Sequence, residues 1–149
     1  MRRRPLLYLD VSAIVKLVLV EPESVALRTV ATTARIAASE LVVVEVARAL
    51  GRVPANQSER ARVRREEQRV LAGLDLVALT RPLLTSAGRL APPRLRSLDA
   101  VHVASALTFG TGVASFVSYD RRQLDAAADV GLTLESGRSR GQVGTAPPP

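Results

Sequence analysis

The sequence predicts an α/β domain in three layers, with a central, mostly parallel sheet of four to five strands flanked by helices. Short apolar runs recur along the chain, and helical patterns separate one run from the next, which is the alternation typical of a parallel sheet. The hydrophobic content of 47% favours a folded domain over a disordered chain. A length of 149 residues suits one domain.

The first fifty residues predict two strands and three helices. Leu6 to Leu9 is an apolar run that reads as a buried strand, and a helix is expected from Ser12 to about Val18. Ser24 is the expected cap of a second helix that ends near Ala31. A second strand is expected at residues 35–38, and a helix from Ser39 to Leu50, which Gly51 ends.

The remaining sequence continues the alternation. Charged residues dominate a helical pattern over residues 58–72, which Gly73 ends. Further helices are expected from Pro82 to before Pro92, over residues 97–108, and from Asp120 to Gly131, with strands at 74–79, 114–117 and 132–134. The predicted domain covers residues 1–135. Residues 136–149 are rich in Gly, Ser, Arg and Pro, and are expected to form a disordered tail.

Composition limits the chemistry. The chain has no cysteine and one histidine, so any metal must be held by oxygen ligands, which favours Mg²⁺ or Mn²⁺. The same composition excludes a disulfide and a two-histidine ribonuclease mechanism, and it suits a reducing, cytoplasmic compartment. Three arginines precede an apolar stretch near the start. Because Asp10 and Lys16 interrupt that stretch, neither a signal peptide nor a membrane span is expected.

The net charge of +7 suits a polyanionic partner, since arginine binds phosphate well. An arginine-rich and alanine-rich composition is also what a GC-rich genome produces. Charge alone therefore identifies no function.

Four carboxylates lie beside apolar sequence, where acids are rarely left unpaired: Asp10, Glu45, Asp99 and Asp120. Each has a structural alternative. Asp10 and Asp120 suit helix caps, and Asp99 suits the first turn of a helix. Glu45 lies three residues before Arg48 and is placed to pair with it. Asp10 and Asp120 also follow strands of one parallel sheet, whose carboxyl ends are where such folds place their sites.

A divalent cation is the natural reason for these acids to converge. Two carboxylates about 4 Å apart repel each other by roughly 4 kcal/mol at an effective dielectric near 20. A bound cation offsets this repulsion. His102 lies three residues after Asp99 on the same helical face, either as a supporting group for the site or as a core histidine bonded to the backbone. Glu40 is offset from Glu45 on the helix and is expected to be structural.

Four blocks of the sequence resemble the PIN-domain family, and within it the VapC toxins. They are LLYLDVSAIVKLVLVEPES, SELVVVEVARAL, SLDAVHVASAL and FVSYDRRQLDAAADVGL, in the family's order, and the resemblance spans residues 6 to 134. The resemblance implies that Asp10, Glu45, Asp99 and Asp120 are both the catalytic residues and the metal ligands. Ser12 matches the family's hydroxyl residue beside the first Asp, and position 11 departs from the common Thr.

The resemblance further implies a Mg²⁺- or Mn²⁺-dependent endoribonuclease that cleaves RNA, forms a homodimer and is inhibited by a cognate VapB-like antitoxin. One alternative is a catalytically inactive PIN-like module that binds RNA or protein. Another is a phosphatase with an aspartyl nucleophile, but such an enzyme needs a second Asp where this chain has Ser12.

Overall fold

The computed structural model describes residues 3–22, 24–91 and 95–136. Within these residues, five parallel strands form one sheet, as the predicted parallel sheet of four to five strands requires, and their order is β3-β2-β1-β4-β5. The strands are β1 (Leu6–Leu9), β2 (Arg35–Ser39), β3 (Asp75–Val77), β4 (Val113–Ser118) and β5 (Leu134–Ser136).

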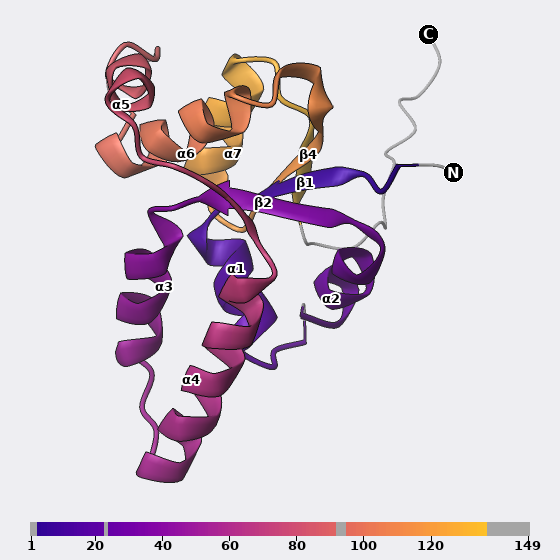
Figure 1. Ribbon diagram of the computed structural model, residues 1–149, viewed down its shortest axis with the longest axis vertical. Helices are drawn as coiled ribbons and strands as arrows, with labels where there is room; N and C mark the ends of the chain where they lie inside the picture. Colours follow the sequence, from indigo (N-terminus) through magenta and orange to yellow (C-terminus); the bar gives the residue numbers. More distant parts are fainter. Residues whose placement is uncertain (1–2, 23, 92–94, 137–149) are drawn as a thin grey trace, which may run out of the picture.

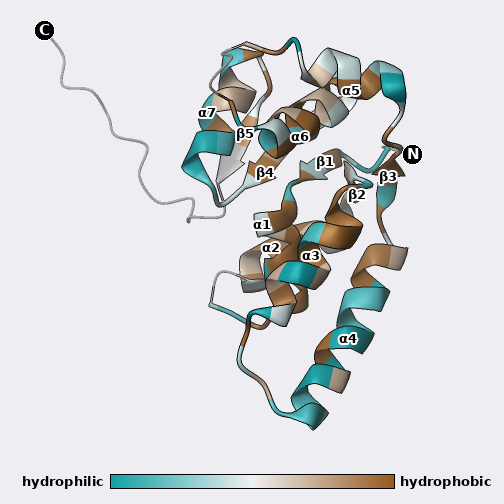
Figure 2. Ribbon diagram, turned by 90° about the vertical axis from the view of Figure 1, so that its left-hand side faces the viewer, coloured by the Kyte–Doolittle hydropathy of each residue, from teal (hydrophilic) through white to brown (hydrophobic). Residues whose placement is uncertain are grey.

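Helices cover both faces of this sheet and make three layers (Figures 1 and 2). Below the sheet in Figure 1 lie α1 (Val11–Val18), α2 (Ser24–Thr33), α3 (Val42–Gly51) and α4 (Gln57–Ala72). Above it lie α5 (Arg81–Ala87), α6 (Ser97–Leu107) and α7 (Arg121–Asp129). A short 3-10 turn, η1 (Gly110–Gly112), precedes β4. From β1 the chain adds β2 and β3 on one side, and it then crosses to add β4 and β5 on the other side of β1. Because each crossover is right-handed, crossovers in opposite directions place their helices on opposite faces of the sheet.

The alternation of side chains along β1 divides the core into two parts. Leu7 and Leu9 pack toward α1, α3 and α4. Leu6 and Tyr8 pack on the other face, where Phe116 and the helices α6 and α7 cover them. Tyr8 stacks on Phe116 with ring centroids 5.2 Å apart. The central strand is therefore buried on both faces, which explains its unbroken apolar run.

Several predicted boundaries shift by a few residues. Helix α3 begins at Val42 instead of Ser39, because Ser39 still belongs to β2. Helix α1 begins at Val11 instead of Ser12, and Asp10 caps it, as the structural alternative for Asp10 predicted. The cap of α4 is Asn56. Residue 136, predicted as the start of the tail, belongs to β5, and the rest of that tail lies outside the described residues.

The strand order places the ends of β1 and β4 side by side at the carboxyl edge of the sheet. Successive strands lie on one side of β1 up to β3 and on the other side from β4 onward, so the order reverses between β1 and β4. Ligands of open α/β sheets bind outside the carboxyl ends of the strands at such a reversal. Asp10 follows β1 there and Asp120 follows β4. Within the described residues, no helix combines the length and the apolar character needed to cross a membrane.

Candidate metal and active site

Asp10 is the most buried of the four predicted acids, with an exposed fraction of 3%. Its Oδ1 accepts hydrogen bonds from the Ala13 N–H at 3.1 Å and the Ser12 hydroxyl at 2.6 Å. Its Oδ2 accepts one from the Ser118 hydroxyl at 2.5 Å. Burial raises the pKa of Asp10, and these hydrogen bonds oppose the rise. Asp10 is thus a helix cap, and it is also a buried carboxylate whose negative charge is disfavoured.

The hydroxyls of Ser12 and Ser118 join the ends of the two central strands. Ser12 Oγ accepts a hydrogen bond from the Tyr119 N–H at 2.9 Å while donating to Asp10. Ser118 Oγ accepts from the Asp120 N–H at 2.9 Å, and it too donates to Asp10. The position of Asp120 is therefore set by the hydrogen bonds of Asp10.

Asp99 and Asp120 lie close enough for their charges to interact. Burial, and then the charge of Asp120, raise the pKa of Asp99, while His102, when it is protonated, and the charges of Arg96 and Arg122 oppose the rise. Gln123, which is 1% exposed, donates from Nε2 to the Asp99 carbonyl at 3.3 Å and so ties α7 to the first turn of α6.

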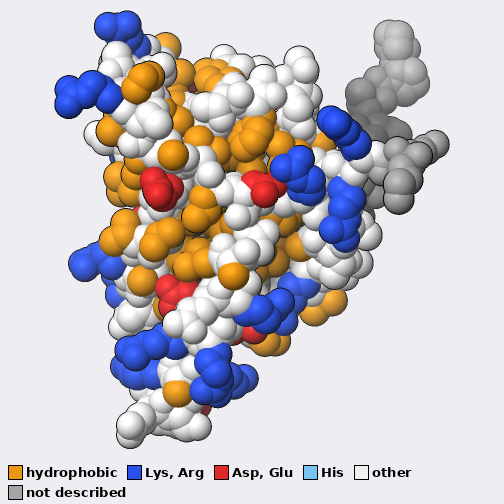
Figure 3. Space-filling view, in the orientation of Figure 1, with side chains coloured by type: hydrophobic (Ala, Val, Ile, Leu, Met, Phe, Trp, Pro, Cys, Tyr) orange, Lys and Arg blue, Asp and Glu red, His pale blue; other side chains and the backbone are white. Residues whose placement is uncertain are grey.

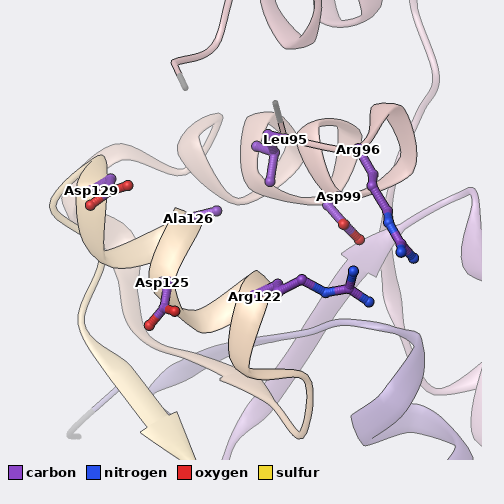
Figure 4. Close-up of a pocket in the computed structure, with 7 residues that line it drawn as sticks. All are labelled: Leu95, Arg96, Asp99, Arg122, Asp125, Ala126 and Asp129. Atoms are coloured by element: carbon purple, nitrogen blue, oxygen red, sulfur yellow. The ribbon is translucent and has the colours of Figure 1, made fainter. Parts of the chain in front are cut away.

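A pocket of about 270 Å³ opens beside Asp99, between α6 and α7. In Figure 4 the side chains of Arg96 and Arg122 extend toward the Asp99 carboxylate from the two helices. Asp125 and Asp129 line the pocket on the α7 side. The sequence analysis did not single out the two arginines.

Glu45 is hydrogen-bonded to His102 of α6. The Oε2 atom of Glu45 lies 2.7 Å from His102 Nε2, and the side chains are 14% and 2% exposed. The partner of Glu45 is thus His102 from α6, instead of the predicted alternative Arg48 on its own helix. His102 hydrogen-bonds side chains and not the backbone: its Nδ1 lies 3.1 Å from the Tyr8 hydroxyl. The sequence analysis placed His102 on the same helical face as Asp99. In the structure, the His102 ring forms its hydrogen bond with Glu45.

The four acids share the carboxyl edge but do not form a ready-made metal cage. Among residues 3–22, 24–91 and 95–136, no three His, Asp or Glu side chains are grouped closely enough to hold one ion. Mg²⁺ does not need such a group, because it keeps several waters and binds through one or two carboxylates together with substrate phosphates. The mutual charge effect of Asp99 and Asp120 marks the pair that a cation would relieve. The residues present therefore fit a hard divalent cation.

Comparison with known proteins identifies the family. The family model described as the PIN domain matches residues 7–129. The chain belongs to the PIN-domain family. Its relatives include two proteins of Mycobacterium tuberculosis. One, named Ribonuclease VapC47, is 38% identical over 88% of this chain and 96% of its own length; the other, Ribonuclease VapC46, is 42% identical over 86% and 95%.

Solved structures of low sequence identity have the same fold. The VapBC2 structure from Rickettsia felis, bound to a DNA fragment from its promoter, gives a TM-score of 0.64 at 15% identity and covers 88% of this chain and 98% of its own. The FitAB structure bound to a DNA fragment gives 0.68 at 14% identity and covers 93% and 99%. The PIN-like α/β fold predicted from the sequence is confirmed.

Neutralising Asp99 should stabilise the protein in the absence of metal. Because the folded state holds the Asp99 proton more tightly than the unfolded state, the stability of the metal-free wild type should fall as pH rises through the raised pKa. Asp99→Asn removes this penalty at neutral pH. Solvent screening reduces the effect at this partly exposed group, so Tm should rise by a few degrees at most, roughly 2–4 °C. Thermal unfolding in EDTA, followed by circular dichroism at several pH values, measures the difference.

The matched control is Asp75→Asn, which removes a carboxylate that Arg35 binds at 2.6 Å on an exposed surface. That variant should lose up to about 1 kcal/mol instead of gaining stability. An Asp99→Asn protein that is less stable than wild type at neutral pH would contradict the assignment of repulsion and burial to Asp99.

Proposed function

We propose that the protein is a divalent-metal-dependent endoribonuclease, the toxin of a VapBC-like toxin–antitoxin pair, with Mg²⁺ or Mn²⁺ as its cofactor. The main support is that Asp10 and Asp120 end neighbouring strands and are linked through Ser118, and that the charge of Asp120 acts on Asp99. Burial also raises the pKa of Asp10 and of Asp99. Structural acids seldom carry such an electrostatic cost, and perturbed carboxylates in a cleft are typical of functional sites. The relatives named VapC ribonucleases support the same reaction.

Each acid has a role in this proposal. Asp99, Asp120 and Glu45 hold the cation, and Asp10 holds it from the buried side while Ser12 and Ser118 orient its carboxylate. The cation, when bound, supplies an activated water and stabilises the charge that develops on the phosphate. The protein excludes bulk water from Asp10 and fixes the carboxylates before substrate arrives.

Arg96 and Arg122 are the proposed contacts for the RNA backbone. Both are exposed, both lie beside Asp99 (Figure 4), and guanidinium groups bind phosphate through paired hydrogen bonds. On the face seen in Figure 3, most Lys and Arg side chains lie toward the outline of the molecule, and a few acidic side chains lie separately among apolar ones.

The proposal includes the partners and the place of action. Two solved structures with the same fold are VapBC2 and FitAB, each bound to a DNA fragment, and this likeness supports a VapB-like antitoxin as the partner of this chain. We further propose a homodimer, a nuclease domain of residues 1–135 and a cytoplasmic location, where RNA is available.

The first test is metal-dependent cleavage of RNA by protein freed of any antitoxin. Mg²⁺ or Mn²⁺ should switch on cleavage, EDTA should abolish it, and Asp99→Asn should lower the rate by at least about 100-fold through loss of charge stabilisation. Gel analysis of a labelled RNA measures the rate, and circular dichroism checks folding.

Equal cleavage in EDTA and in Mn²⁺ would contradict the metal assignment. RNA binding without cleavage in either condition, with Asp99→Asn binding as well as wild type, would favour the inactive binding module instead.

The second test concerns the two arginines. The double variant Arg96→Ala/Arg122→Ala should raise KM for RNA by roughly tenfold or more and weaken its dependence on salt, because it removes two phosphate contacts. Arg35→Ala is the matched control, since Arg35 lies at the start of β2, on the opposite edge of the sheet. Steady-state kinetics at several salt concentrations gives both readouts. An unchanged KM in the double variant would remove these arginines from the RNA site.

A further inference from the structure

A chain of hydrogen bonds crosses the interior from β2 to Glu45. The Ser39 N–H donates to the Tyr8 hydroxyl at 3.0 Å. That hydroxyl lies 3.1 Å from His102 Nδ1, and His102 Nε2 lies 2.7 Å from Glu45 Oε2. These hydrogen bonds link β2, β1, α6 and α3. The side chains of Tyr8 and His102 are both buried.

The donors and acceptors give this chain a direction. Because the Tyr8 oxygen already accepts from Ser39, its own proton is available to Nδ1 of His102. Burial raises the pKa of Tyr8, so the hydroxyl keeps its proton at neutral pH. A neutral imidazole that accepts at Nδ1 carries its proton on Nε2 and donates it to the Glu45 carboxylate.

The rings of this chain are held in place by packing. Tyr8 stacks on Phe116 at an interplanar angle of 16° and meets the His102 ring edge-on at 73°. Glu45, in contrast, projects from a helix with several rotatable bonds and is only partly buried. An unrestrained glutamate of this kind loses side-chain entropy when it binds a ligand, and a fixed donor removes part of that cost in advance.

We propose that Tyr8 and His102 are positioning residues that hold Glu45 in one orientation for the cation, with Oε2 taken by His102 and Oε1 left to the metal. The inference rests on the proposed function, since it names how one ligand of that same site is prepared. Groups that orient metal ligands commonly change metal affinity by about 10–100-fold when they are removed. His102 thus orients the Glu45 carboxylate, and Tyr8 orients His102 by selecting its tautomer.

Mn²⁺ binding to metal-free protein tests the proposal without any measurement of activity. Tyr8→Phe keeps the ring and its stack on Phe116 but removes the hydroxyl, and it should weaken Mn²⁺ binding by about tenfold in isothermal titration calorimetry. Thr29→Val also removes a single hydroxyl, on the exposed surface of α2, and should leave the affinity within about twofold. Tyr8→Phe protein that is folded and binds Mn²⁺ as tightly as wild type would overturn the proposal.

Two substitutions of His102 separate positioning from simple packing. His102→Gln keeps an N–H donor near Glu45 and should retain most of the Mn²⁺ affinity, whereas His102→Leu has similar bulk and no donor and should lose it. Equal Mn²⁺ affinity of these two variants, both folded, would show that the ring only fills space.

Nitrogen-15 NMR of the wild-type protein gives a test that needs no variant. Because His102 is the single histidine of the sequence, the imidazole signals belong to it alone. In mildly alkaline, metal-free solution we expect a proton on Nε2 and none on Nδ1. A proton on Nδ1, as would follow if Tyr8 donated to the nearby Ser105 hydroxyl instead, would overturn the relay.

The proposed function and the positioning role of Tyr8 and His102 can be contradicted by different results. Wild-type protein that binds no Mn²⁺ and cleaves no RNA would overturn the proposed function, and this inference with it. Wild-type protein that binds Mn²⁺ and cleaves RNA, with Tyr8→Phe matching it in affinity, would overturn the inference alone.

Discussion

The buried carboxylate of Asp10 is the constraint on which the rest of the site depends. Its hydrogen bonds from Ser12 and Ser118 join the end of β1 to the end of β4, and Ser118 in turn receives the backbone N–H of Asp120. Removing a carboxylate from water is costly unless it is hydrogen-bonded, and even with these bonds its pKa remains raised. The fold carries this cost where the strand order reverses, which is where a cation would offset it.

Most of the fold could be predicted from the sequence, because the local apolar patterns and the alternation of strands with helices indicate the same architecture. The apolar run before Asp10 is a buried strand, as the sequence predicts. The run before Asp120 is also a strand, as predicted, and its second half is buried. Glu40 was expected to be structural, and its carboxylate accepts the Leu79 N–H at 3.1 Å. The shifted start of α3 shows the limit: Ser39 has the chemistry of a helix cap, but pairing with β3 keeps it in the sheet.

The site was harder to predict because its contacts join residues far apart in the sequence. Periodicity placed His102 beside Asp99, three residues away, yet its hydrogen bond goes to Glu45, 57 residues away. No local pattern carries that pairing, which arises from how α3 and α6 meet across the sheet edge. Ser118 had a weaker signal: it stands two residues before Asp120, as Ser12 stands two residues after Asp10. The spacing is a usable hint that a hydroxyl supports each acid.

The central claim is that a divalent cation binds among Asp10, Glu45, Asp99 and Asp120. A crystal structure of the protein soaked with Mn²⁺, with anomalous scattering data, tests it most directly. The account predicts an anomalous peak at the carboxyl edge of the sheet, with carboxylate oxygens of Asp99 and Asp120 about 2.0–2.2 Å away, near the distances of hard-cation sites. A peak bound only by other residues, or none at saturating Mn²⁺, would contradict the account.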